Sequence, residues 1–229
     1  MAELQQHGSE SIKKLLLKHG VKEPFFGVKV EYLKVIQKKV KKNYELAKEV
    51  YATGNADAMY LAGLIADDAK MTKGDLQTWV QQATSQNVSE YTVPWVAAEG
   101  KYGFELAMEW INNPVEHIAA SGWSTLSNLA ALKPDAQLDI PVYRSLLERV
   151  ANTIHGEQNR VKQMMNSFVI SVGGYITALT AEAIATARKI GVVMVDMGDT
   201  ACKVPSAEEY IGKIDARGAL GKKKKTVKC

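Results

Sequence analysis

The sequence predicts an all-α fold: a single-domain α-solenoid of antiparallel helix pairs with a basic C-terminal extension. Helix-start signals recur roughly every 15 to 25 residues, and the segments between them are apolar on one helical face. Alternation typical of a strand is confined to Val192–Val195. Short amphipathic helices at close spacing bury their apolar faces by stacking, as in an α-solenoid. An irregular helical bundle is the alternative arrangement.

Helical periodicity and capping residues place the individual elements. We expect helices, in chain order, over residues 9–18, 30–41, 43–53, 56–67, 72–83, 87–99, 102–111, 114–131, 141–153, 158–176 and 180–190, with a further short helix at 207–215. Thr72, Asp139 and Ser206 are expected to cap the helices that follow them, because their side-chain oxygens accept hydrogen bonds from the first turn. Asn87 and Asn113, each with a glutamate three residues later, predict two capping boxes.

The helix expected over 30–41 carries two stripes. Spacings of three and four residues place one apolar set on a single face, namely Leu33, Ile36 and Val40. A second face is basic and consists of Lys34, Lys38 and Lys41. One apolar and one basic stripe are what a helix in a stacked array needs if that array holds a polyanion.

Positive charge is concentrated at the two ends of the chain. Residues 1–50 hold eleven lysines and six glutamates, a net charge of +5, and residues 212–229 carry +6. The region between them carries −7. Attraction to nucleic acid must therefore come mainly from the ends. We divide the chain into a helical repeat domain over 1–190 and a C-terminal extension with a lysine-rich tail over 191–229.

Composition is that of a globular protein, with 46% hydrophobic and 24% charged residues. No apolar run approaches the roughly 20 residues needed to cross a bilayer, and the first residues do not resemble a secretion signal. Cys202 and Cys229 have no neighbour at ligand spacing, which favours a reducing, cytoplasmic location. The four histidines are scattered, so we expect no metal and no cofactor.

Two helices carry candidate binding residues. Tyr91 and Trp95 are four residues apart and project from one face, either into the core or as an aromatic wall against a base or sugar. On the helix over 158–176, a methionine-rich stripe is expected to be core. Lys162, Asn166 and Ser167 fall on its other side.

Three segments resemble one known family. FFGVKVEYLKVI at 25–36, ADAMYLAGLIADD at 56–68 and NRVKQMMNSFVISVGGYI at 159–176 are similar to elements of the AlkD-type DNA alkylation repair glycosylases. The resemblance covers roughly residues 20–180. It implies a solenoid of HEAT-like repeats whose concave, basic face grips duplex DNA and which excises N3- or N7-alkylated purines. In that family, an aspartate four residues after a tryptophan and a second tryptophan on a late helix carry the chemistry.

The chain departs from the family at those positions. Matching the motifs places the tryptophan–aspartate pair on Tyr91 and Trp95, and the late tryptophan on Ser167. None of the three keeps the family's residue. Glu90 or Glu99 offers a replacement carboxylate, although neither has the family's spacing. The sequence therefore leaves open whether the protein is a glycosylase.

The resulting prediction is a DNA-binding protein that recognises or slowly excises alkylated purines. The residues expected to contact duplex DNA are Trp95, Lys162, Asn166, Lys222, Lys223, Lys224 and Lys225. The lysine run is either a flexible, salt-sensitive DNA contact or a disordered solubilising tail. The alternative function is a non-catalytic scaffold whose groove binds a protein or a small ligand.

Overall fold

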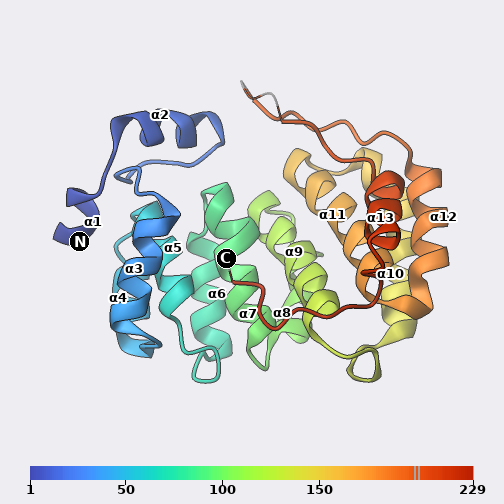
Figure 1. The fold of residues 1–229 in the computed structure, drawn as a ribbon, viewed down its shortest axis with the longest axis horizontal. Helices are drawn as coiled ribbons and strands as arrows, with labels where there is room; N and C mark the ends of the chain where they lie inside the picture. Colours follow the sequence, from blue (N-terminus) through green and yellow to red (C-terminus); the bar gives the residue numbers. More distant parts are fainter. Residues whose placement is uncertain (199, 201, 229) are drawn as a thin grey trace.

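The computed structural model describes residues 1–198, 200 and 202–228, and these form a two-layered, curved stack of helices (Figure 1). The inner layer contains, in order, α3 (Val30–Val40), α5 (Ala56–Ile65), the π-helical turn η1 (Val88–Thr92) with α7 (Val93–Glu99), α9 (Glu116–Leu132), α11 (Asn159–Tyr175) and α13 (Ala207–Ala216). The outer layer contains α4 (Tyr44–Tyr51), α6 (Lys73–Gln82), α8 (Gly103–Trp110), α10 (Ile140–Thr153) and α12 (Thr180–Ile190).

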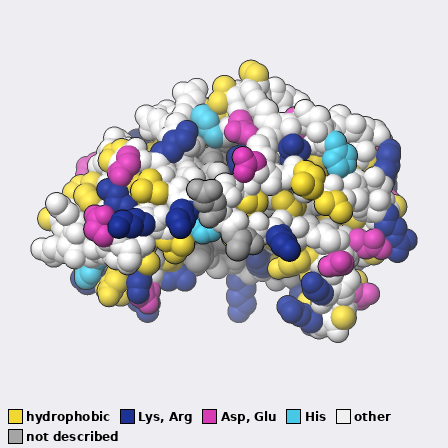
Figure 2. Space-filling model, turned by 90° about the horizontal axis from the view of Figure 1, so that it is seen from above, with side chains coloured by type: hydrophobic (Ala, Val, Ile, Leu, Met, Phe, Trp, Pro, Cys, Tyr) yellow, Lys and Arg dark blue, Asp and Glu magenta, His cyan; other side chains and the backbone are white. Residues whose placement is uncertain are grey.

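The remaining short elements lie at the start of the chain and between the layers. They are α1 (Ala2–Gln6), α2 (Glu10–Lys18) and the 3-10 turns η2 (Asp135–Gln137), η3 (Ile154–Gly156) and η4 (Thr177–Leu179). From above, the stack is an arch, hollowed at the lower edge of Figure 2 between two lobes, with Lys and Arg side chains on both lobes and in the hollow. The all-α solenoid is confirmed. No single helix of the described chain is both long and apolar enough to cross a bilayer; α11 and residues 177–190 pass only as a pair, bent by 115°.

Each expected helix is present, and most predicted caps form. Thr72 makes a full capping box with Asp75, and the Asp139 and Ser206 side chains accept from the first turns of α10 and α13. The predictions for Asn87 and Asn113 are wrong. Asn87 is already helical and its side chain caps nothing, while Asn113 accepts from the N–H of Val115 in a local turn before α9.

The alternation at Val192–Val195 does not form a strand. Val193 is buried in the C-terminal half of the core, whereas Val192 and Met194 are 81% and 74% exposed. The segment alternates because it is extended along the helices, and no strand lies beside it within the described residues. The period-two alternation therefore reflects the burial of Val193 between exposed neighbours, and it does not indicate a sheet.

Two of the motif segments fold against each other. The Asp57 carboxylate, at the start of α5, accepts hydrogen bonds from the backbone N–H groups of Phe26 (2.6 Å), Gly27 (3.0 Å) and Val28 (3.3 Å). Gly27 has a φ of +78°, and a side chain there would meet the backbone of α2. Burial raises the pKa of Asp57, and the three N–H donors oppose that rise. The FFGV motif is therefore a structural junction.

The chain end returns across the whole stack. After α13, which packs on α11 and α12, residues 217–228 run over the carboxyl ends of the inner helices and finish near α7 (Figure 1). We call this segment the C-terminal strap (residues 217–228). Val227 packs against the N-terminal half of the core, far from the preceding helix. The extension thus reaches well beyond the last helices, to the N-terminal half of the stack.

Candidate nucleic-acid interface

The centre of the inner layer is shaped by a proline. Pro94 lacks an N–H and cannot donate to the carbonyl four residues earlier in a regular α-helix. The backbone forms the π-helical turn η1 at this point, and the N–H of Val93 donates to the carbonyl of Val88, five residues earlier. Such π-helical turns are rare and often occur at functional sites. Here the turn contains Tyr91, onto which the resemblance to the AlkD-type family maps a motif residue, and it lies between α5 and α9.

The carbonyls freed by this irregular turn are satisfied from the next inner helix. Ser121 of α9 donates its hydroxyl to the carbonyl of Ser89, and Ser124 donates to that of Glu90, each at 2.6 Å. Serine hydroxyls at this spacing lie one turn apart on one face of α9. The turn is therefore fixed to α9, and the orientations of Glu90 and Tyr91 are fixed with it.

Glu90 forms a buried, bidentate ion pair with Arg160, the second residue of α11. Arg160 donates Nε to one carboxylate oxygen at 2.6 Å and Nη2 to the other at 2.7 Å. The glutamate side chain is 2% exposed and that of the arginine is 14% exposed. Burial raises the pKa of Glu90, and the guanidinium opposes that rise. This contact, which joins residues 70 apart, holds the third and fifth inner elements, η1 and α11, together over the amino end of α9.

Arg160 is also tied to the C-terminal extension. Its Nη1 lies 3.8 Å from Sδ of Met197, and it lines a cleft of about 470 Å³ together with the end of α2 and residues 196–198. The neighbouring Asn159 clamps this loop, because its side chain accepts from the N–H of Asp196 at 2.7 Å and donates to its carbonyl at 2.8 Å. The amino ends of the inner helices are therefore covered from both termini.

The predicted aromatic pair is split between core and surface. Trp95 is only 5% exposed and packs edge-on against Tyr60 of α5, with ring centroids 5.3 Å apart. Tyr91 is 50% exposed, and its ring centroid lies 6.1 Å from that of Trp95. Trp95 thus belongs to the core, contrary to its expected place against DNA. Tyr60, Trp95 and Tyr91 form an aromatic cluster, and Tyr91 is the member that is exposed to solvent.

The α11 candidates point in different directions. Asn166 is 1% exposed, and its amide donates to the carbonyl of Pro205 at 3.0 Å, so it holds the extension and offers nothing to solvent. Lys162, one turn earlier, lies on the same flank and is half-buried. Ser167 is half-buried and bonds the carbonyl of Gln163 in its own helix. The three residues expected to act together are therefore not brought to one surface.

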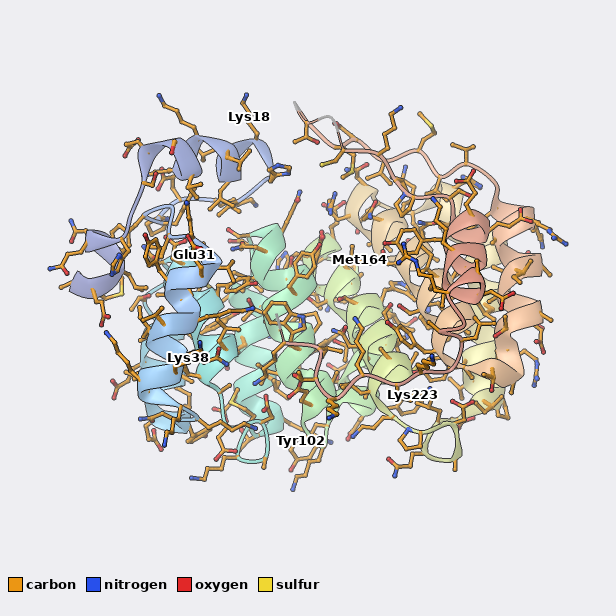
Figure 3. The ribbon with its side chains drawn as sticks, viewed as in Figure 1. Lys18, Glu31, Lys38, Tyr102, Met164 and Lys223 are labelled. Carbon is orange, nitrogen blue, oxygen red and sulfur yellow. The ribbon has the colours of Figure 1, made fainter. Side chains whose placement is uncertain are left out.

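The lysine run is neither flexible nor uniformly exposed. Within the C-terminal strap, Lys223 pairs with Asp135 at 2.8 Å and donates to the carbonyl of Ala130 at the end of α9. Figure 3 shows Lys223 where the strap crosses the lower end of the stack. The exposed lysines of the run are Lys222, Lys224 and Lys225, of which Lys224 lies over the ring of Tyr175. These contacts hold the tail against the folded helices. The tail is therefore neither a flexible DNA contact nor a disordered segment, the two alternatives that the sequence left open.

The replacement carboxylates are both engaged. Glu90 is held by Arg160, as described above. One oxygen of Glu99, at the end of α7, accepts from the Thr226 hydroxyl and, at 3.0 Å, from the N–H of Val227 in the strap. Glu90 is therefore not available to stabilise a cationic sugar, whereas Glu99 keeps its charge and is tied to the strap through one oxygen. Among the described residues, no three His, Cys, Asp or Glu side chains gather as a metal site.

Sequence reasoning missed the partners of these groups. Arg160 stands in the NRVK motif, but no spacing rule links it to a glutamate 70 residues earlier. Tyr60 lies within the ADAMY motif and reads as an ordinary core position. The one usable signal was Pro94 inside an expected helix, which predicts irregular backbone and unpaired carbonyls at that point.

Comparison with known proteins identifies the family of this arrangement. The family model described as DNA alkylation repair enzyme matches residues 1–201. Two uncharacterized proteins, Lin0241 of Listeria innocua and Lmo0209 of Listeria monocytogenes, are 32% and 31% identical over 217 residues, covering 92% of this chain and 93% of each relative.

One solved structure is similar over the whole chain. It represents a family of proteins related to the HEAT-like repeat DNA glycosylases, with affinity for branched DNA structures. It is 37% identical, superposes with a TM-score of 0.92, and the match covers 100% of this chain and 97% of that one. The chain belongs to the DNA alkylation repair enzyme family.

Proposed function

We propose that this protein binds DNA through the hollowed inner face of the solenoid and prefers branched DNA to a plain duplex. The observation that carries the proposal is the similarity, at 37% identity and over the full chain, to a protein with affinity for branched DNA. Function does not follow from a fold alone. The inner face must therefore offer chemistry that suits DNA, and two of its features do.

The first feature is the basic stripe of α3. The side chains of Lys34, Lys38 and Lys41 make no hydrogen bond or ion pair with any described residue. Lys38 lies on the side of α3 that faces the viewer, toward the hollow (Figure 3). Unpaired lysines attract phosphates without reading sequence, which suits a ligand recognised by its backbone and shape.

The second feature is Tyr91. Its ring is half-exposed on a turn that Ser121 and Ser124 hold in place, with Trp95 behind it. Exposed aromatic rings stack on unpaired or unstacked bases of any sequence. A branch point offers such bases, whereas a continuous duplex does not. The exposed ring of Tyr91 therefore supports a preference for branched DNA over a continuous duplex.

Catalysis is the finer part of the proposal. With Glu90 neutralised by Arg160 and Glu99 tied to the strap at the carboxyl end of α7, excision of N3- or N7-alkylated purines lacks a free carboxylate beside Tyr91. Loss of one such group costs about 3 kcal/mol, or roughly two decades in rate. We therefore expect recognition without efficient excision. Release of 3-methyladenine and 7-methylguanine from alkylated duplex DNA, followed over hours at protein excess, should match the spontaneous rate; faster release contradicts this.

Binding is tested with a four-way junction and a duplex of equal length, by fluorescence anisotropy across a salt series. We expect tighter binding to the junction, weakening steeply between about 50 and 200 mM salt. Tyr91→Ala should reduce the preference for the junction. Phe104→Ala, which removes an exposed ring from the outer helix α8, is the control and should not. No binding of either DNA at low salt would contradict the proposal and favour the scaffold alternative.

A further inference from the structure

A groove lies between α3 and the C-terminal strap, away from the aromatic cluster. It has a volume of about 620 Å³ and opens where the carboxyl ends of α3 and α5 approach the strap. The lining residues are Gln37, Lys38, Lys41, Lys42, Leu64, Glu99, Thr226 and Lys228. Two of them, Thr226 and Lys228, lie beyond residue 201, where the match to the family model ends. The strap wall thus lies outside the family-model match, although the similar solved structure covers it.

The carboxylates near this groove are satisfied by lysines and by the strap. Asp68, 4% exposed, lies between Lys42 at 3.0 Å and Lys228 at 2.6 Å. Lys228 is itself 8% exposed and also reaches the carbonyl of Ala66. Glu99 accepts from the strap's hydroxyl and N–H groups as described. The charge of Asp68 is therefore compensated by lysines, whereas Glu99 is held by neutral donors alone.

Two lysines in the groove are left without a partner among the described residues. Lys38 and Lys41 are exposed, lie three residues apart and point from the last turn of α3. Lys41 ends α3 with a φ of +60°, a conformation that turns the chain sharply at the groove. Asp68 carries two lysine partners and Glu99 carries none, so with Lys38 and Lys41 the groove has a surplus of positive charge.

We propose that this groove, formed by α3 and the C-terminal strap, binds backbone phosphate of a DNA arm. The proposal rests on the proposed DNA binding and assigns to the strap a part in it. Lysine ammonium groups bind phosphate as hydrated point charges without base contacts. The role of Lys228 is to hold the strap against Asp68, so that the groove is preformed. Lys38 and Lys41 then supply the phosphate contacts.

The test compares two doubly substituted proteins of equal net charge. Lys38→Gln/Lys41→Gln removes the free cations of the groove. Lys101→Gln/Lys189→Gln removes two exposed lysines outside its lining, on the α7–α8 loop and on outer helix α12. With a four-way junction, the groove variant should bind roughly tenfold more weakly at about 0.1 M salt. The slope of log K against log [salt] should fall by about 1.8 for two lost contacts.

The outcomes separate this inference from the proposed function. If the wild type binds the junction and the groove variant binds no worse than the control, the groove assignment is wrong while DNA binding stands. If the wild type binds no DNA, both are wrong. Junctions with and without 5′-phosphates distinguish the phosphate source. An equal loss on both supports a backbone phosphate, and a loss confined to the phosphorylated junction overturns that assignment in favour of a terminal phosphate.

Discussion

The two basic ends of this chain resemble each other in sequence and differ in structure. On α3 and at its carboxyl end, the side chains of Lys34, Lys38 and Lys41 have no partner among the described residues. In the C-terminal strap, Lys223 and Lys228 are drawn into ion pairs with Asp135 and Asp68 and onto helix-terminal carbonyls. The first group is available to an anionic ligand. The second is largely used inside the molecule, where cations suit the carboxyl ends of helices.

The difference shows that counting charges does not locate a binding surface. A lysine contributes to phosphate binding only if no carboxylate of its own chain has already neutralised it. Of the four consecutive lysines at 222–225, one is an anchor and the others face outward. Substituting cations one at a time, from the buried and paired to the exposed and unpaired, tests whether pairing determines how much each contributes to stability.

The largest effect is expected at Arg160, the most completely paired cation of the inner layer. Arg160→Met leaves Glu90 buried without its partner and should cost about 3–5 kcal/mol in the free energy of unfolding. Urea denaturation measures this. The control is Arg144→Met, which breaks an exposed arginine–glutamate pair with Glu182 and should cost about 1 kcal/mol or less. Equal costs at both positions would show that burial does not distinguish the two pairs.

An intermediate effect is expected at the strap. Lys228→Met removes one of two cations from Asp68, while Lys42 remains, so the loss should be about 1–3 kcal/mol. Lys225→Met is the matched control, because that lysine is exposed and makes no ion pair among the described residues. Comparable denaturation midpoints for the two variants would mean that the strap is not anchored through Lys228.

A small effect on stability is expected at α3. Lys38→Gln should change the free energy of unfolding by no more than about 0.5 kcal/mol, because the side chain is exposed and unpaired. Thermal melting checks this, with Lys223→Gln as the paired counterpart, whose melting temperature should fall. A larger loss at Lys38 than at Lys223 would reverse the comparison between the two ends.

The smallest effect concerns pH. Burial lowers the pKa of His117, with hydrogen bonds to the backbone of residues 80 and 81 opposing it. The unfolded chain then takes up a proton near pH 6.5 before the folded one does, so stability should fall as pH drops through that region. His117→Gln should flatten melting temperature against pH between about 7.5 and 5.5. The substitution His19→Gln, at an exposed histidine, is the control and should leave the curve of melting temperature against pH unchanged. A flattened curve in that control would mean that His117 is not the source of the pH dependence.

Local signals predicted the helices and several of their ends. Periodicity located the eleven main helices and the short one at 207–215, since each buries one face. The Thr72, Asp139 and Ser206 caps form because they need only their own first turns. Asn87 fails as a cap because Pro94 imposes the π turn, and Glu90 is needed by Arg160. Helix α1 was missed, as its five residues give too short a pattern.

The candidate site was predictable only in part. Tyr91 has the exposure that the aromatic-wall prediction required, and its contact with DNA stays a prediction. Trp95 and Asn166 were misplaced because a residue's helical face does not say which neighbour covers that face. Trp95 is covered by Tyr60, and Asn166 is covered by the segment at Pro205. Both partners are more than 30 residues away in the chain.

By itself, the sequence determined the helices, their amphipathic faces and the family, because these depend on residues within a few turns of one another. Only the tertiary structure decided which charges remain free. The pairs of Glu90 with Arg160 and of Asp68 with Lys228 join residues 70 and 160 positions apart. Ion pairing depends on distance in space and on burial, and neither is encoded in local spacing. The basic stripe of α3 therefore remains an exposed surface. Two of the five strap lysines, Lys223 and Lys228, instead anchor the strap, through pairs that form only when distant parts of the chain pack together.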